Sequence, residues 1–376
     1  MDVVGQPGGP VAGSRRAEVL AAVAARGMIR VTDLAREFGV TPVTVRRDVA
    51  ELADAGLVRR VHGGATAIET ADQHRSTTPS SRVAPGRAPV VGGAVGMLVP
   101  SLDYYWPDVA RGVEEETRAL GLRMALRGSV YEAADERGDV QRLIEGGADG
   151  LLLAPTVTGP GGDLMRAWLA ETEVPVVLME RNAVVGDERR AVESVTTDHR
   201  GGIAMAVHHF TSLGHRRIGV ALSQHSPHVG QLHAGWHAAC TDLGLDTAGV
   251  VDLPVPDRPD PGFTAAIEAV VDAVLETGTT ALIVHSDPEA LRVVQRAAER
   301  GLSVPGDLSV LAYDDQVAPL ATPALSAVRP PRRTIGRTAV SLLAARMADP
   351  GRPVHRVQVS PTLKVRSSSG PPRQAR

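Results

Sequence analysis

A group of hydroxyl and guanidinium side chains near the N-terminus has the composition of a polyanion-binding site. The stretch TPVTVRRD places Thr41, Thr44, Arg46 and Arg47 within the first two turns of one expected helix. Hydroxyls and backbone amides at a helix N-terminus bind phosphate, and an arginine can donate to two acceptors on a guanine edge. These residue types therefore indicate nucleic-acid binding. In the alternative interpretation, Arg47 pairs with Glu51 on an ordinary solvated helix.

A cluster of aromatic residues forms a second candidate site. The chain of 376 residues has only 3 Trp, 4 Tyr and 3 Phe, yet Tyr104, Tyr105 and Trp106 are consecutive. Consecutive side chains of a helix or strand point to different faces, so packing alone does not explain the cluster. Flat rings can stack on the apolar face of a sugar or a nucleobase. We expect Tyr105 and Trp106 to form such a stacking surface; the alternative is that the rings pack under a lobe or at a dimer interface.

The basic residues lie in a segment with the pattern of a helix-turn-helix and a wing. Three short helices are expected, capped by Ser14, Thr32 and Thr41, and Gly39 supplies the turn between the second and the third. The alternating run LVRRVHGGA follows and would form a wing containing Arg59 and Arg60. Residues 14–65 carry nine arginines against six acidic residues, although the whole chain has a net charge of −3. This excess favours a polyanionic partner.

The segment VTDLAREFGVTPVTVRRDVAELADAGLVRRVHGGA resembles the winged helix-turn-helix domain of DeoR-type bacterial transcriptional regulators. The likeness includes VRRD on the recognition helix and the terminal RVHGGA. It implies a DNA-binding domain at residues 14–65, preceded by a disordered N-terminus at residues 1–13. It also implies which residues contact DNA, on the helix and on the wing: Thr41, Thr44, Arg46, Arg47, Arg60, His62 and Gly63.

The pattern of the rest of the chain predicts a linker followed by an α/β body. Residues 66–89 are rich in Ser, Thr and Pro without an apolar period, which is typical of a linker. From residue 90 onward, short apolar runs alternate with amphipathic ones, and the pattern repeats after a break near Asp198. We therefore expect an α/β fold of two lobes, each a doubly wound parallel sheet, with ligands bound between them at the carboxyl ends of the strands. The expected strands are AVGMLV, RMALR, GLLLA, PVVLME, SVTT, RIGVAL, ALIVH and LSVLAY.

The order of several motifs in this body resembles the effector domain of the LacI/GalR repressors, which is itself similar to periplasmic sugar-binding proteins. Among the motifs are AVGMLVPS, ADGLLLAP, VPVVLMERN, TTDHRGGIAMAVHHFTSLGHRRIGV and VPGDLSVLAYDDQ. The resemblance covers residues 90–366 and implies an effector-binding and dimerisation domain there, with a disordered tail at residues 367–376. It implies a set of effector contacts after the strands: Tyr105, Trp106, Glu180, Ser286, Asp287 and Asp314.

Two positions depart from that family's pattern. Ser286 stands where the family commonly has an asparagine, and Leu232 stands where it usually has an arginine that binds sugar. Gln231 and His233 are neighbours that could supply the missing donor; the alternative for each is surface or core packing. The DeoR-type wing and the linker also replace the family's hinge helix, so neither family explains how effector binding reaches the DNA-binding domain.

These features together predict a ligand-responsive transcriptional regulator of the repressor type. It would bind double-stranded operator DNA as a homodimer and sense a sugar or a related small metabolite. The alternative is a sugar-processing α/β enzyme with an appended DNA-binding domain, which lacks sequence support because there is no Ser/His/Asp ordering and no Gly-rich phosphate loop after a strand. No catalysis and no cofactor are expected.

Metal, cysteine and membrane functions are also not expected. The histidines of QHSPHVGQLHAGWH are irregularly spaced and no cysteine joins them, so no metal site is predicted. The lone Cys240 fits a small buried apolar residue. The N-terminus does not have the pattern of a secretory signal, and no apolar run approaches the ~20 residues that span a bilayer. A cytoplasmic location is therefore expected.

Overall fold

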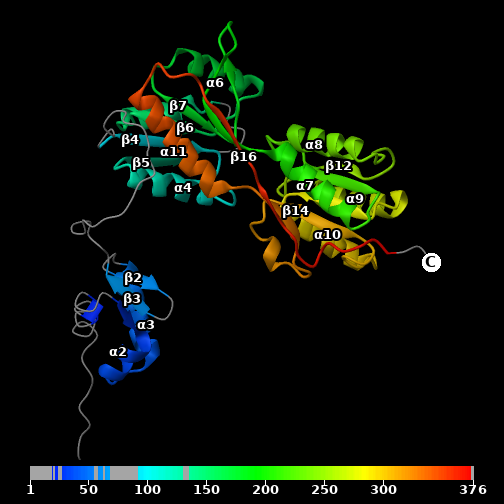
Figure 1. The fold of residues 1–376 in the computed structure, drawn as a ribbon, viewed down its shortest axis with the longest axis horizontal. Helices are drawn as coiled ribbons and strands as arrows, with labels where there is room; N and C mark the ends of the chain where they lie inside the picture. Colours follow the sequence, from blue (N-terminus) through cyan, green and yellow to red (C-terminus); the bar gives the residue numbers. More distant parts are fainter. Residues whose placement is uncertain are drawn as a thin grey trace, which may run out of the picture. The chain divides into compact units, whose positions relative to one another are not determined.

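The computed structural model describes residues 19, 22–23, 28–54, 58–61, 64–67, 92–129 and 135–373. The chain divides into two compact units, Met1–Ala84 and Pro85–Arg376. Figure 1 shows the second unit as two α/β lobes. No helix in the described ranges has the length and apolar character needed to cross a bilayer.

The first unit contains the predicted helix-turn-helix. Helix α2 (Val31–Glu37) is followed by α3 (Pro42–Asp54), and Gly39 between them has a φ of +64°. This left-handed conformation suits glycine, as the sequence predicted. Strands β1 (Met28–Arg30), β3 (Gly64–Ala67) and β2 (Val58–Val61) form an antiparallel sheet in that order.

The caps of the first unit agree only in part with the expectation. Thr41 directly precedes α3, and its Oγ1 accepts a hydrogen bond from the amide of Thr44 at 3.3 Å. Helix α2 begins at Val31, so Thr32 lies inside the helix and not at its cap. Ser14, the expected cap of the first helix, lies outside the described residues, as do residues 1–13 and most of the linker.

The first lobe of the second unit is a six-stranded parallel sheet with apolar cores on both faces. Its strand order is β16 (Arg356–Val359), β10 (Ser194–Thr197), β7 (Val176–Met179), β6 (Gly150–Leu153), β4 (Ala94–Val99) and β5 (Arg123–Gly128). Its helices are α4 (Trp106–Ala119), α5 (Arg137–Glu145), α6 (Gly159–Glu171) and α11 (Arg332–Ala348). A small ribbon, β8 (Val184–Val185) with β9 (Arg190–Ala191), extends from it.

The second lobe repeats this plan. Its strand order is β12 (Asp252–Val255), β11 (Ile218–Ser223), β13 (Ala281–His285), β14 (Ser309–Tyr313), β15 (Ser326–Arg329) and β17 (Thr362–Lys364), and only the β15–β17 pairing is antiparallel. Its helices are α7 (His199–Ser212), α8 (Val229–Asp242), α9 (Phe263–Thr277) and α10 (Asp287–Glu299), with a short 3₁₀ turn, η1 (Ala318–Leu320). Apolar cores again cover both faces, and Cys240 is buried in one of them.

The two-lobed α/β architecture is confirmed, and so is the break near Asp198. All eight predicted strands are present, but β8, β9, β15, β16, β17 and β12 were not expected; in β12, Pro254 interrupts the apolar pattern. This strand lies at the edge of its sheet, where a proline costs no ladder hydrogen bond on the open side.

The predicted disordered tail is wrong for residues 367–373. Ser368 is fully buried, donates to the carbonyl of Val310 at 2.6 Å and accepts from the amide of Ser326 at 2.8 Å. Polar side chains hold this segment against the second lobe, so the apolar pattern of the sequence did not predict that the segment is ordered.

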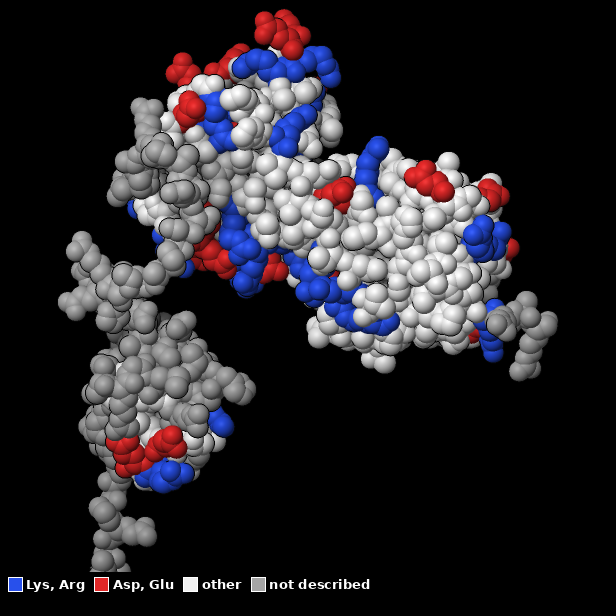
Figure 2. Space-filling view, in the orientation of Figure 1, with Lys and Arg blue, Asp and Glu red and all other residues white. Residues whose placement is uncertain are grey.

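The chain passes between the lobes after β10, after β15 and after β16. As a result α11 follows a strand of the second lobe but packs beside α4 in the first lobe, as Figure 1 shows. Ion pairs join the exposed sides of these two helices, since Glu115 lies 3.4 Å from Arg333 and 3.1 Å from Arg337. Figure 2 shows acidic and basic side chains mixed in this part of the lobe.

Two glycines set the close approach of α4 and α11, and this yields a testable prediction. A Cβ at Gly112 would overlap the carbonyl oxygen of Arg333, and one at Gly336 would overlap that of Val109. Because backbone atoms cannot move aside without separating the helices, we expect Gly112→Ala to lower the free energy of unfolding by about 1–3 kcal/mol or more. Urea denaturation measures this change.

Gly230 provides a matched control for that substitution. It also lies in a helix, α8, but no atom lies within 4 Å of the position that a Cβ would take. Gly230→Ala should therefore leave stability unchanged or raise it by about 0.5–1 kcal/mol through helix propensity. Equal denaturation midpoints for the two variants would contradict the proposed close approach.

Candidate functional site

Helix α3 presents the predicted basic face to solvent. Thr41, Arg46 and Arg47 are exposed and Thr44 is half-buried, while Val45 lies in the apolar core on the opposite side. The hydroxyls of Thr41 and Thr44 lie 2.9 Å apart at the helix N-terminus. These side chains are therefore accessible to a partner, and the DNA contacts assigned to the helix remain predictions.

The predicted wing is present as an antiparallel ribbon. In strand β2, Arg59 and Arg60 pair through their backbones with Thr66 and Ala65 of β3. His62 and Gly63 lie outside the described residues. The DNA contacts assigned to the wing remain predictions.

In the second unit, residues at the carboxyl ends of strands from both lobes come together. We call the set Tyr105, Glu180, His199, His228 and Tyr313 the interlobe cluster. Two surface pockets, of about 670 and 500 Å³, lie elsewhere, one beside α6 and β8 and the other beside α9 and α10. Neither pocket includes a residue of the interlobe cluster.

Glu180 is the centre of this cluster. It follows β7 with a φ of +53°. Residues other than glycine rarely adopt this conformation, and those that do are often found at binding sites. Its carboxylate accepts hydrogen bonds from the Tyr105 hydroxyl at 2.5 Å and from the amide and hydroxyl of Thr197 at 2.9 and 2.7 Å. The structure thus brings together Tyr105 and Glu180, two of the predicted effector contacts.

The charge of Glu180 follows from these partners. Burial by itself would raise the pKa of this carboxyl, but His199, the Thr197 amide and the Tyr105 hydroxyl outweigh it and lower the pKa below its usual value. The group is therefore ionised at neutral pH although only 2% of the residue is exposed.

The two predicted aspartates have different environments. Asp314 follows β14 with a φ of +103°, and Arg332 donates a hydrogen bond to its carbonyl oxygen. Asp287 is fully buried, and its carboxylate accepts hydrogen bonds from four successive amides, those of residues 315–318. Burial raises the pKa of each aspartate to about 6. The carboxylate of Asp287 therefore holds a loop, whereas that of Asp314 remains a candidate effector contact.

Ser286 and Trp106 also have structural roles that the sequence did not indicate. Ser286 caps α10 in a capping box, and its hydroxyl donates to Glu289 at 2.6 Å. Trp106 is the first residue of α4 and is only 2% exposed in the apolar core of the first lobe. The structure corrects the expectation that Trp106 offers a stacking surface, and it supports the alternative that the ring packs within a lobe.

The two candidate replacement donors do not join the interlobe cluster. His233 lies one turn into α8 and pairs with Asp252 at 2.9 Å, where both side chains are exposed to solvent. Gln231 is half-buried on the same helix. Leu232 between them is fully buried in a core of the second lobe. The position that carries a sugar-binding arginine in the LacI/GalR family is thus a packing position here.

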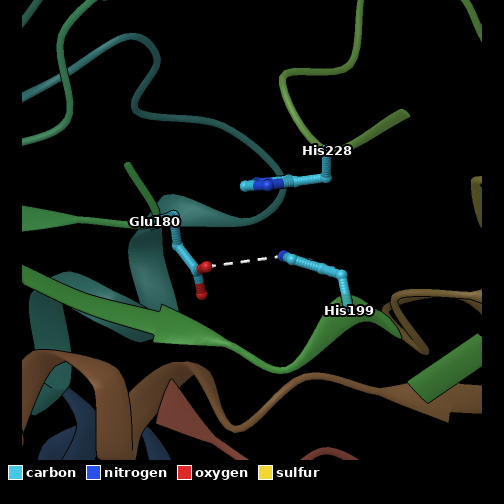
Figure 3. A group of neighbouring side chains, drawn as sticks. All are labelled: Glu180, His199 and His228. Carbon is cyan, nitrogen blue, oxygen red and sulfur yellow. Dashed lines mark ion pairs between the residues drawn. The ribbon is translucent and has the colours of Figure 1, made fainter. Parts of the chain in front are cut away.

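Sequence reasoning missed the histidines of the cluster, which Figure 3 shows beside Glu180. Nδ1 of His199 lies 3.1 Å from the hydroxyl of Tyr313, and its Nε2 lies 3.5 Å from a carboxylate oxygen of Glu180. The ring of His228 stacks on that of His199 with centroids 3.9 Å apart. His199 and His228 each follow the carboxyl end of a strand, β10 and β11, and this position was the available signal.

Comparisons with known proteins agree with both units. Residues 15–71 match a model of the DeoR-like helix-turn-helix domain, and residues 207–369 match a periplasmic binding protein-like domain. An HTH-type transcriptional regulator of Streptomyces limosus is 32% identical over 290 residues, covering 74% of this chain and 79% of the relative. The transcriptional repressor PurR of Photobacterium profundum is 26% identical over 281 residues, covering 73% of this chain and 80% of the repressor.

Solved structures share the fold of the second unit. A transcription regulator named GntR from Chromobacterium violaceum superposes with a TM-score of 0.60 at 27% identity, covering 73% of this chain and 99% of that one. A LacI family regulator from Enterococcus faecium, solved with bound ribose, gives a TM-score of 0.59 at 21% identity, with 74% and 99% covered. The chain belongs to the HTH-type transcriptional regulators of the LacI/GalR kind, and carries a DeoR-like helix-turn-helix domain together with a periplasmic-binding-protein-like domain.

Proposed function

We propose that this regulator is a homodimeric repressor that binds operator DNA through α3 and responds to a small polyhydroxylated molecule, such as a sugar, bound at the interlobe cluster. The observation that carries the proposal is the convergence of buried hydrogen-bonding groups from both lobes at the carboxyl ends of their strands. Ligands of doubly wound folds bind at this position.

The electrostatics of the strand ends favour a neutral, hydroxyl-rich ligand. Glu180 is ionised, and Asp314 is a buried carboxyl whose pKa burial raises to about 6, so an anionic ligand would meet like charge. The buried guanidinium groups of Arg181 and Arg332 donate to backbone carbonyls, those of Pro155 and Asp314. Carboxylates and ring nitrogens suit the hydroxyls of a sugar, because these hydroxyls donate as well as accept.

The relatives agree with this ligand class and with regulation as the function. Among them are a ribose operon repressor of Escherichia coli and an arabinose metabolism repressor of Geobacillus stearothermophilus. An effector that prefers one arrangement of the lobes would change DNA affinity through linkage, and a coupling of about 1–3 kcal/mol corresponds to roughly a 5- to 150-fold change.

A direct experiment selects the operator first and then tests the effector. The purified full chain is used to select its preferred DNA from a random library, and fluorescence anisotropy then measures operator affinity with a panel of pentoses, hexoses and disaccharides. We expect one class of sugar to change the affinity by roughly 5- to 150-fold. Operator binding that responds to none of these sugars, combined with no sugar binding in calorimetry, would exclude a sugar as the effector.

The recognition helix gives a further prediction. Arg46 is exposed near the N-terminus of α3, so Arg46→Ala should weaken operator binding by about 1–3 kcal/mol if its guanidinium contacts a base edge. Arg118→Ala on α4 is a matched control, because Arg118 is also exposed on a helix and pairs only with the neighbouring Glu114 among the contacts of the described residues. Equal operator affinities for the two variants at one salt concentration would remove Arg46 from the DNA contacts.

A further inference from the structure

Arg332 lies where the chain passes from the second lobe back to the first. It follows β15 and two prolines, and it is the first residue of α11, which packs in the first lobe. Pro330 and Pro331 restrict the backbone of this crossing, because the ring of a proline fixes its φ. The amide of Arg332 donates to the carbonyl of Pro330 at 3.0 Å. A long cationic side chain is thus held at the junction of the lobes.

The guanidinium group of Arg332 contacts both lobes. In the second lobe it donates a hydrogen bond to the carbonyl oxygen of Asp314. In the first lobe its Nε lies 3.4 Å from a carboxylate oxygen of Asp108 on α4. Its central carbon lies over the ring of Tyr105, 5.6 Å from the ring centre, which is within the range of a cation–π contact. One side chain thus links Tyr105 and Asp314, two predicted effector contacts from different lobes.

The backbone on both sides of this junction has a conformation that needs support. Asp314 has a φ of +103°, and Tyr104, which precedes Tyr105, has a φ of +57°. Residues other than glycine keep such conformations only where the surrounding contacts hold them. Gln316 supplies one such contact, because its Nε2 donates to the carbonyl of Tyr104 at 2.8 Å. Arg332 supplies another at Asp314.

The ion pair with Asp108 does not by itself account for the burial of Arg332. Asp108 also pairs with Arg111 at 2.9 Å and with Arg333 at 3.8 Å. The side chains of these two arginines are 59% and 52% exposed, whereas that of Arg332 is 8% exposed. A guanidinium that served only Asp108 could remain at the surface as they do. The burial of Arg332 therefore indicates a role in its other contacts, those with the two predicted effector contacts.

We propose that Arg332 is a positioning residue for effector binding, which fixes the ring of Tyr105 and the backbone of Asp314 relative to each other across the lobe junction. Its guanidinium orients these residues through a carbonyl oxygen and a ring face, and leaves the carboxylate of Asp314 and the hydroxyl of Tyr105 to the effector and to Glu180. The proposal rests on the proposed function, because it concerns the same effector site.

Arg332 also acts on the charge of Asp314. Burial raises the pKa of this carboxyl to about 6, while the positive charges of Arg332 and His199 act in the opposite direction. Among the described residues, the other titratable groups that interact with it are those of Glu180, Asp287, Glu289, Tyr104, Tyr105 and Tyr313. A substitution of Arg332 leaves all of these in place. Loss of the guanidinium therefore raises the pKa of Asp314 further.

Two neighbouring arginines provide the test and its control. Arg332→Gln removes the guanidinium that contacts both lobes. Arg333→Gln removes a cation from the same turn of α11, and the printed ion pairs of Arg333 are with Asp108 and Glu115, both on α4. Asp108 keeps Arg111 as a partner in each variant. Thermal melting checks that both variants fold.

Hydrogen–deuterium exchange of the effector-free full chain, followed by mass spectrometry, tests the positioning directly. We expect Arg332→Gln to speed the exchange of amides in residues 104–108 and 314–316 by about 10-fold or more, because a charged, buried hydrogen bond is lost. Arg333→Gln should leave these amides unchanged. Equal exchange in the two folded variants would overturn the positioning role, whatever the effector is.

Effector binding gives the second readout, by calorimetry with the sugar that the wild-type chain binds. We expect Arg332→Gln to weaken binding about 10- to 100-fold and Arg333→Gln to leave it unchanged. An effector that needs ionised Asp314 binds less tightly as the pH falls through the pKa of that carboxyl. Because Arg332→Gln raises this pKa, the loss should begin at a higher pH, whereas a purely structural defect would lower affinity by the same factor at every pH.

Arg332→Lys completes the series, because lysine keeps the charge but lacks the planar group of donors. It should bind the effector more tightly than Arg332→Gln and keep the wild-type pH dependence. If Arg332→Gln does not fold, Arg332→Lys and Arg333→Lys replace the pair in both measurements. Unchanged affinity and pH dependence in a folded Arg332 variant would overturn the proposal. A wild-type chain that binds no sugar would overturn the proposed function instead, and the exchange experiment would still decide the role of Arg332.

Discussion

Trp106→Ala is expected to lower the free energy of unfolding by about 3–5 kcal/mol, the range for removing a fully buried tryptophan ring. Its ring packs in the core of the first lobe with Val95, Val109 and Ile335, and only 2% of the residue is exposed. Because Ile335 lies on α11, the cavity would also loosen a helix that follows a strand of the second lobe. Urea denaturation followed by circular dichroism measures the loss.

Two other variants serve as controls for the stability loss expected in Trp106→Ala. Leu320→Ala truncates a side chain that is 82% exposed and should change stability by less than about 0.5 kcal/mol. Tyr105→Phe keeps the ring but removes the hydroxyl that donates to Glu180, so it should weaken effector binding more than stability. If Trp106→Ala instead retained full stability and lost only its effector response, the ring would belong to the binding site and not to the core.

Asp287→Ala should destabilise the second unit by about 3 kcal/mol or more. The substitution leaves the four amides of residues 315–318 without their common acceptor, and each buried donor left unpaired costs about 1–3 kcal/mol. These amides follow Asp314 directly, so effector affinity should fall together with stability. Thermal and urea denaturation, with effector titration on the folded fraction, test both effects.

Asp257→Ala is the control for this prediction. Asp257 also lies in a loop after a strand of the second lobe, but its side chain is 54% exposed and its ion pair with His225 is at the surface. Exposed pairs contribute only about 0–1 kcal/mol. Similar losses for Asp257→Ala and Asp287→Ala would show that the four amides do not depend on the buried carboxylate.

The sequence by itself determined the features that depend on neighbouring residues along the chain. These features are the cap at Thr41, the left-handed turn at Gly39 and the apolar face of α3. Each depends on residues only a few positions apart, so its pattern can be recognised in the sequence. The strands with uninterrupted apolar runs were visible for the same reason. Edge strand β12 was missed because Pro254 breaks the run, and only its place at the sheet edge makes the proline acceptable.

The tertiary structure alone decided which residues meet. Trp106 follows a strand end like its neighbour Tyr105, yet the start of α4 turns one ring into the core and places the other against Glu180. His199 and His228 lie far apart from Glu180 in the sequence, and the crossing of the chain between the lobes brings their rings to its carboxylate. The burial of a side chain and the identity of its contacts depend on packing between segments that are distant in the sequence. A single sequence gives the residue types of these segments but does not show which of them come into contact.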